Sequence, residues 1–208
     1  MSLLTPWGYE LSTLSTLDSI LSVADFNTMT ANKYSGDTRI AGALSAASQN
    51  IRDYCGWHLY PSTGCKFSTT FYDCRVSTVH SDILIQLPAR FVSAVTSVKI
   101  ADEAYTTFVL ETNGILRVYD ASVRGLRLHS KIEVEYTAGI PDTLANAIKD
   151  VTVNKVVKEL VKSNGVQSET AGGVSISYNA AWMADASAST MSSVEKATLS
   201  PYQLKGVF

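Results

Sequence analysis

Apolar residues recur at helical spacing through residues 39–55, and this stretch is the strongest periodic signal in the chain. One continuous stripe is made by Ile40, Leu44, Ala47, Ile51 and Tyr54. Asp37 or Thr38 can cap the start of a helix here, and Gly56 stands where a helix C-terminus favours a residue that tolerates positive φ. We therefore expect a long helix ending at residue 55, around which the rest of the chain is organised.

The face of this helix opposite the stripe has small and uncharged side chains. They are Gly42, Ser45, Ala46 and Gln49. An ordinary surface helix would show more charge on this face. Small residues let another backbone approach closely, either within the fold or from a neighbouring subunit. We interpret this face as a subunit interface, with a helix buried in its own domain as the alternative.

Three further segments have helical character. Leu14 to Ala24 suggests a short amphipathic helix, and a weaker Ala- and Ser-rich helix is expected from about Ser187 to Leu199, where Pro201 stops it. A second long helix is expected over residues 142–163, with Pro141 at its start and apolar residues along one side. Its several valines are weak helix formers, so packing must hold it.

Between the two long helices the period changes from helical to alternating. Residues 131–136 alternate cleanly, with Ile132, Val134 and Tyr136 predicted to point inward. Asn113-Gly114 predicts a two-residue turn of a hairpin over residues 107–119. We expect about six strands, mostly antiparallel, in a β insert over residues 64–138 or so. Helices on both sides of such an insert predict an α+β fold.

The segment after the second long helix is predicted to be a mobile loop that orders on pairing with a neighbour. Its Gly pair gives flexibility, and the run VSISY reads as a short unpaired strand. The residues assigned to it are Gly172, Gly173, Val174, Ile176 and Tyr178. The N-terminal 11 residues are expected to be an irregular arm that packs on a domain.

Composition points to a protein that associates with other subunits. Only 17% of the 208 residues are charged and 46% are hydrophobic. Much of the surface is therefore expected to be buried by association with other subunits. The net charge of −2 argues against a dedicated nucleic-acid grip. No apolar run is long enough for a membrane span, and the N-terminus lacks the features of a secretory signal.

No residue set makes a convincing active site. Cys55 and His58 could form a nucleophilic pair or half of a metal site, but the sequence offers no second ligand pair at suitable spacing. A packed thiol is the better interpretation, because Cys55 lies on the apolar side of its helix. Glu133 and Glu135 are interpreted as a solvated strand face. We predict no catalytic residues, no metal and no cofactor.

Four stretches together resemble one known family. They are AASQNIRDYCGWH at 46–58, VEYTAGIPDTLANAIKD at 134–150, SETAGGVSISY at 168–178 and LSPYQL at 199–204. In this order and spacing they resemble the head–tail connector (adaptor, or head completion) proteins of tailed bacteriophages. The resemblance implies a single connector domain over residues 1–208, with a helical bundle core at 12–60 and 141–208 that carries the β insert.

The resemblance also implies a function. A connector of this family would form a ring, with dodecameric symmetry in the virion, between the portal vertex and the stopper or tail completion protein, and DNA would pass through without sequence-specific binding. It would lie in the virion neck, and in the host cytoplasm during assembly, with no membrane partner. The family uses its C-terminal region to grip the portal, which assigns portal docking to Leu199, Pro201, Tyr202, Leu204, Val207 and Phe208.

Two other classes of function stay open from the residues alone. A β-rich binding accessory of a phage tail would need exposed aromatic residues on the sheet, for which the candidates are Phe71, Tyr72, Tyr105 and Tyr119. A Cys/His hydrolase would need an exposed Cys55 thiol with a depressed pKa.

Overall fold

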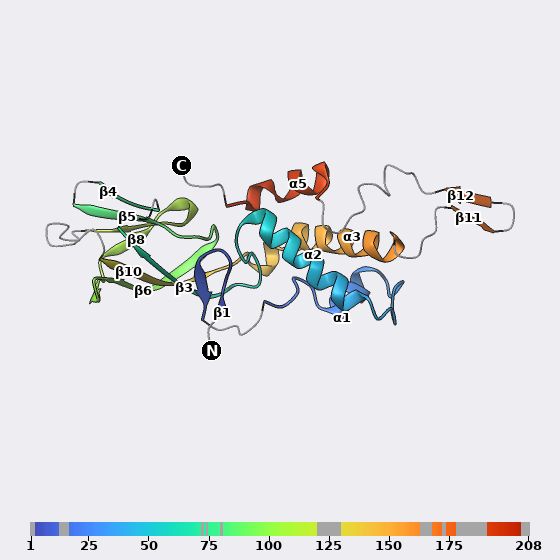
Figure 1. Ribbon diagram of the computed structural model, residues 1–208, viewed down its shortest axis with the longest axis horizontal. Helices are drawn as coiled ribbons and strands as arrows, with labels where there is room; N and C mark the ends of the chain where they lie inside the picture. Colours follow the sequence, from blue (N-terminus) through green and yellow to red (C-terminus); the bar gives the residue numbers. More distant parts are fainter. Residues whose placement is uncertain are drawn as a thin grey trace. The chain divides into compact units, whose positions relative to one another are not determined.

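The computed structural model describes residues 3–12, 17–71, 73, 75–79, 81–119, 130–162, 168–171, 174–177 and 191–204. The chain divides into two compact units, which are described separately. Unit 1 comprises Met1–Leu17, Gly56–Asp142 and Tyr202–Phe208, and unit 2 comprises Asp18–Cys55 and Thr143–Pro201. Figure 1 follows the chain through these elements from blue to red.

Unit 1 contains a six-stranded sheet in the order β1-β2-β3-β10-β6-β7. The strands are β1 (Leu3–Leu4), β2 (Tyr9–Leu11), β3 (Thr63–Thr70), β10 (Lys131–Ala138), β6 (Val92–Ile100) and β7 (Glu103–Ala104). β10 runs antiparallel to both β3 and β6, with Val134 opposite Phe67 on one side and Val98 on the other. The predicted alternation in β10 is confirmed, because Ile132, Val134 and Tyr136 are buried.

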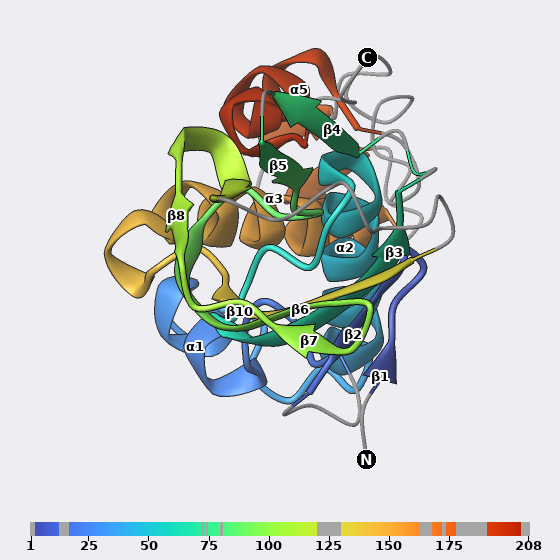
Figure 2. The same cartoon turned by 90° about the vertical axis from the view of Figure 1, so that its left-hand side faces the viewer.

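A second sheet in unit 1 has the order β4-β5-β9-β8. Its strands are β4 (Val76–Val79), β5 (Asp82–Gln86), β9 (Ile115–Val118) and β8 (Phe108–Leu110). The predicted hairpin is the β8–β9 pair, but its connection is longer than two residues and includes a short 3₁₀ turn, Thr112–Gly114. Asn113 and Gly114 both have positive φ there, as the Asn-Gly signal indicates. Figure 2 shows both sheets of unit 1 from the side.

The N-terminal segment belongs to the large sheet. Tyr9 pairs with Phe67 in the β2–β3 ladder, and its side chain is buried. The Tyr9 hydroxyl accepts a hydrogen bond from the His58 backbone N–H at 2.9 Å and lies 2.7 Å from His58 Nδ1. His58 Nε2 is 3.0 Å from the carbonyl oxygen of Ala138, which can only accept, so Nδ1 accepts from Tyr9 in a neutral imidazole. The expected irregular arm is thus a sheet element.

Unit 2 contains the helices α1 (Val23–Met29), α2 (Ile40–Cys55), α3 (Asn146–Lys162) and α5 (Ser193–Leu199), and a 3₁₀ turn at Asp142–Leu144 precedes α3. α2 confirms the predicted central helix, and α3 begins a few residues later than predicted. Residues 17–22, expected in a first helix, are not helical, and α1 starts after Ser22 caps it. The apolar stripes of α2 and α3 meet in one core, which contains Leu21, Phe26, Ile40, Leu44, Ala47, Val156 and Leu160.

Two short strands lie between α3 and α5 in the chain. β11 (Ser168–Ala171) and β12 (Val174–Ser177) form an antiparallel hairpin of their own. The run that was expected to be an unpaired strand is therefore paired within its own chain. Among the residues that the structure describes, no helix combines the length and apolar character needed to cross a bilayer.

The predicted helical bundle core with an inserted β subdomain is wrong. In the described part of the chain there are four α-helices, of which α1 and α5 have only 7 residues each, and two antiparallel sheets carry a core of their own. The β unit is not an insert either, because β1 and β2 at the N-terminus join β3. The error arose because α2 and α3 give strong periodic signals, whereas strands of two and three residues give none.

Candidate functional site

The predicted interface residues lie together on one exposed face of α2. Gly42, Ser45, Ala46 and Gln49 are all exposed. On the opposite stripe Ile40, Leu44, Ala47 and Ile51 are buried, and Tyr54 is half-buried. A Cβ atom built at Gly42 would meet nothing within 4 Å, so none of the residues that the structure describes covers the face at that position. Gln49 Nε2 donates to Asp53 Oδ1 at 2.8 Å along the same helix. The face can accept a flat, uncharged partner surface, and its role as an interface stays a prediction.

The C-terminal helix α5 starts with a complete capping box. Ser192 Oγ accepts from the Glu195 backbone N–H at 3.2 Å, and Glu195 Oε2 accepts from the Ser192 backbone N–H at 2.9 Å. Two N–H groups that the first helical turn leaves unpaired are satisfied in this way. A helix of this length is marginal alone, so the cap and its packing decide whether it forms.

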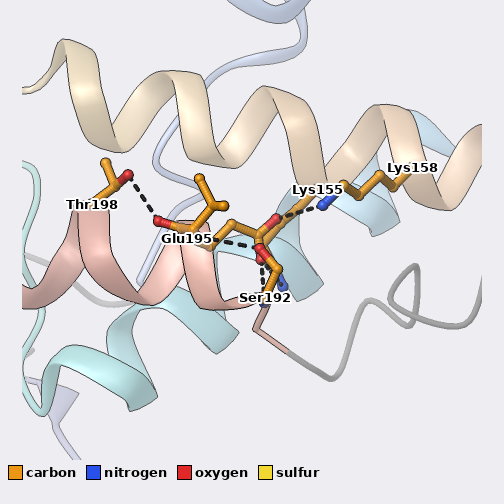
Figure 3. Close-up of polar contacts among 6 residues, drawn as sticks. Lys155, Lys158, Ser192, Glu195 and Thr198 are labelled. Carbon is orange, nitrogen blue, oxygen red and sulfur yellow. Dashed lines mark hydrogen bonds and ion pairs between the residues drawn. The ribbon is translucent and has the colours of Figure 1, made fainter. Parts of the chain in front are cut away.

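A nearly buried charge cluster holds α5 against α3 (Figure 3). Lys158 Nζ lies 3.0 Å from Glu195 Oε1, and Lys155 Nζ lies 3.8 Å from Oε2. The Lys155 side chain is only 2% exposed and that of Glu195 8%, so both charges are largely removed from water. Two ammonium groups therefore share one carboxylate, which also closes the helix cap.

The cluster shifts the pKa values of its members. Burial alone would raise the pKa of Glu195, but the Ser192 backbone hydrogen bond and the two lysines outweigh it and hold that pKa below its usual value. Burial lowers the pKa of Lys155, and the attraction of Glu195 opposes this shift only in part. The ion pair between Glu195 and Lys155 is a structural anchor, and burial of both charges carries a desolvation cost.

The residues assigned to portal docking lie at different depths. Leu199 is fully buried, Pro201 is exposed, and Tyr202 and Leu204 are half-buried. Val207 and Phe208 lie outside the described residues.

Within unit 1, the Tyr202 carbonyl accepts from Trp57 Nε1 at 2.8 Å, and the Tyr202 ring lies 6.1 Å from that of Phe91. Arg90 Nη1 donates to the Gln203 carbonyl at 3.3 Å. This part of the C-terminal segment is therefore packed on its own unit, and its docking role stays a prediction.

The predicted mobile-loop residues are only partly described. Val174 and Ile176 lie in β12, opposite Ala171 and Glu169 in the backbone register. Gly172, Gly173 and Tyr178 lie outside the described residues.

The Cys55 and His58 pair does not form a nucleophile. Cys55 is fully buried, and burial raises the pKa of its thiol to about 12, so almost no thiolate exists at neutral pH. The His58 ring is bonded to Tyr9 and to the carbonyl of Ala138. Within the described ranges no three His, Cys, Asp or Glu side chains gather as metal ligands. The geometry favours the packed thiol.

A cleft of about 320 Å³ lies on the solvent face of the large sheet. Its charged residues are Glu10, Lys66, Lys131 and Glu133. Glu133 accepts from Lys131 at 2.8 Å and is 3.4 Å from Lys66, so this carboxylate pairs with both lysines of the cleft. Tyr72 lies outside the described residues, and the other aromatic candidates, Phe71, Tyr105 and Tyr119, are half-buried. Neither observation favours the alternative of a β-rich binding accessory, which needs exposed aromatic residues on the sheet.

The chain belongs to the family described as "HCP: Head completion protein", whose model matches residues 19–185. Its fold is similar to a solved structure described as "Neck of empty GTA particle computed with C6 symmetry". That match has a TM-score of 0.51 and 18% sequence identity, and it covers 96% of this chain and 97% of the other. No curated protein matches the chain significantly. The predicted membership of the head–tail connector and head completion family is confirmed.

Sequence reasoning missed the anchor between α3 and α5. Glu195 and Lys155 were not singled out, because a charged residue at a buried position breaks the hydrophobic pattern instead of extending it. One signal was present: Ser192 followed three residues later by Glu195 is the sequence signature of a capping box. The ion pair between Lys155 and Glu195 joins residues 40 positions apart, so no local sequence pattern indicates it.

Proposed function

We propose that this protein is a structural subunit of the neck of a tailed phage or phage-like particle. Copies of the chain form a ring that joins the portal vertex to the stopper or tail completion protein, and DNA passes through its centre without sequence-specific contacts. The subunit is made in the host cytoplasm and ends in the virion neck. The observation that carries the proposal is the head completion family match over most of the chain.

Three further features support it. The fold is similar along almost its whole length to a chain in the neck of another particle, where C6 symmetry is compatible with a ring of six or twelve copies. The uncharged outer face of α2 suits a contact between subunits, since a ring needs two complementary faces on each copy. The chain as a whole has few charges and a net charge of −2. This suits a channel for DNA, because a strongly basic lumen would hold the phosphate backbone.

Within this proposal the C-terminal segment docks on the portal. The segment that follows α5 includes exposed Pro201 and half-buried Tyr202 and Leu204. Leu204 is followed by only one charged residue, Lys205, in the last four positions of the sequence. Each such contact is small, but a ring presents many copies at once and gains from their effective concentration. The segment at 166–178 pairs with a neighbour when the neck assembles, because a lone two-stranded hairpin is marginally stable in water.

Removal of the gene tests the proposal directly. Without this protein, cells should accumulate DNA-filled heads and separate tails, and purified protein added to such an extract should restore joined particles. A variant lacking only residues 205–208 keeps α5 and its anchor, so it should fold normally yet join heads poorly. Joined particles that form at the normal yield without the protein would refute the proposed function.

A further inference from the structure

The segment at 202–204 is held on unit 1 through its backbone. The Tyr202 carbonyl accepts from Trp57 Nε1 at 2.8 Å, and the Gln203 carbonyl accepts from Arg90 Nη1 at 3.3 Å. Both bonds use main-chain oxygens, so they fix the path of the chain and leave the side chains of the segment available. Residues close to a chain terminus are usually poorly ordered unless contacts of this kind tie them down.

Side-chain contacts add to the two backbone bonds. The Tyr202 ring lies 6.1 Å from that of Phe91, which in turn stacks on Trp57 at 6.2 Å with an interplanar angle of 14°. A Cβ atom built at Gly56 would lie 3.8 Å from Cβ of Leu204. Tyr202 and Leu204 are nevertheless only half-buried, so part of each side chain stays at the surface of the subunit.

The bond to Trp57 opposes any release of the segment. Trp57 is fully buried, and its indole N–H donates to the Tyr202 carbonyl. An indole offers a single donor, so departure of the segment would leave a buried N–H group without its acceptor. The contacts therefore favour a segment that stays in place over one that swings away.

The surface that receives the segment is itself fixed. Trp57 packs against the ring of His58 at 5.4 Å, and both nitrogens of that ring are within hydrogen-bond distance of other groups. The Phe91 carbonyl accepts from the Gly139 N–H at 2.9 Å. A Cβ atom built at Gly139 would overlap the backbone of Ser62, so this close approach requires glycine. Side chains supported in this way can position a neighbouring group precisely.

We propose that Trp57, Phe91 and Arg90, called the C-terminal clamp below, are positioning residues that keep the segment 202–204 in place while it docks on the portal. This inference rests on the proposed function, which assigns docking to the C-terminal segment. The half-exposed side chains of the segment then reach the portal already ordered. A segment ordered beforehand loses less conformational entropy on binding, and every copy in a ring presents it in the same arrangement.

A reversible disulfide between positions 56 and 204 tests whether the segment stays in place. The variant carries Gly56→Cys and Leu204→Cys, with Cys74→Ser to remove a native thiol. The 3.8 Å separation of the two Cβ positions suits a disulfide. Cys55 and Cys65 react slowly, because burial raises the pKa of each thiol to about 12. The disulfide is formed with oxidised glutathione and is reversed with dithiothreitol.

Binding to DNA-filled heads purified from cells that lack this protein is compared between the two redox forms of the variant. Loss of the Leu204 side chain affects both forms equally, so it cancels. The oxidised form should bind within about twofold of the reduced form, or more tightly, because docking needs no release of the segment. Loss of binding on oxidation would mean that the segment must leave its site, and this would overturn the inference. A disulfide that fails to form would contradict the placement of position 204 beside position 56.

A clamp variant supplies a readout that a purely structural role would not give. Trp57→Phe keeps an aromatic ring beside Phe91 but removes the N–H that holds the Tyr202 carbonyl. Binding to the heads should weaken on the order of tenfold, because the segment must then become ordered on docking. Oxidation of the 56–204 disulfide in the same variant should restore most of this loss. Binding that stays weak after oxidation would overturn the positioning role.

A second clamp variant covers the case in which Trp57→Phe alters the circular dichroism spectrum. Arg90→Met, at a half-buried position, removes the donor to the Gln203 carbonyl and is judged by the same loss and rescue. Lys99→Met, at an exposed position of β6, is the matched control and should bind normally. Failure of the unaltered protein to bind the heads would refute the proposed function, and the inference with it. Normal binding by the unaltered protein without rescue of the clamp variants refutes the inference alone.

Discussion

Replacing Glu195 by Gln removes one charge from the anchor of α5 and little else. The amide keeps the shape of the side chain and an oxygen that can accept from the Ser192 backbone N–H. What it loses is the charge that faces Lys158 at 3.0 Å and Lys155 at 3.8 Å. The substitution therefore tests the ion cluster, whereas Ser192→Ala tests the cap and should cost only about 1 kcal/mol.

The expected loss of unfolding free energy follows from burial. Breaking a buried pair costs about 3–5 kcal/mol, because the remaining charge is left in a poorly hydrated place. Lys155 is 2% exposed, but its ammonium lies at the long end of ion-pair distance, which favours the lower value. Lys158 is 23% exposed and adds about 0.2–1 kcal/mol. We expect a loss of about 3 kcal/mol, or about 6–12 °C in Tm for a chain of this size.

The pH dependence gives a signature that a general packing defect would not show. The pKa of Glu195 is lowered on folding, so its stabilising contribution is present above the usual value of 4.5 and is lost as the pH falls through the folded pKa. The pKa of Lys155 is lowered too, so the cost of its burial disappears as the pH rises toward 10.5. Wild-type protein should lose stability below pH 4.5 more steeply than Glu195→Gln does.

Urea denaturation of the full chain, followed by circular dichroism between pH 3 and 9, measures the loss of stability at pH 7 and the steeper acid dependence of the wild type. The control is the double variant Lys155→Met with Glu195→Leu, because an apolar pair of similar volume often restores the stability that a broken ion pair loses. If Glu195→Gln unfolds within about 0.5 kcal/mol of wild type at pH 7, the reasoning about the anchor is refuted.

Three other predictions follow from the fold. Ala46→Arg, at an exposed position of α2, should leave the monomer folded but abolish ring formation in analytical ultracentrifugation; outright unfolding would mean that the face is intramolecular. Tyr9→Phe removes the hydroxyl that contacts the backbone N–H and Nδ1 of buried His58. It should lower the free energy of unfolding by about 2–3 kcal/mol. An unchanged Tm would contradict this hydrogen-bond network. Backbone amides of residues 168–177 should exchange quickly in free protein and slowly in assembled necks; equal protection would count against pairing with a neighbour.

The helices show which features a sequence reveals. α2 was predictable because its apolar stripe and the glycine that follows it are local signals that agree, and the structure places Gly56 at positive φ after a helix over Ile40–Cys55. The outward and inward residues of β10 were predictable for the same reason, since alternation is local. The family followed from the order of four short motifs.

The features that the sequence did not reveal depend on contacts between residues far apart in the chain. β1 and β2 are too short to show a period, and Tyr9 is recognisable as a strand residue only once Phe67 and His58 are beside it. The helical bundle was predicted wrongly because the sheet core is assembled from segments that no local pattern connects. The anchor at Glu195 and the contacts of Tyr202 with Trp57 and Phe91 likewise become visible only in the folded structure.

A cryo-electron microscopy reconstruction of the neck of intact particles, made without imposed symmetry, tests the central claim most directly. The account predicts a ring of copies of this chain, twelve if it follows the portal, lying between the portal and the stopper or tail completion protein around an open channel. A neck whose density at this level is filled by another protein, with this chain absent or present as a single copy, would contradict it.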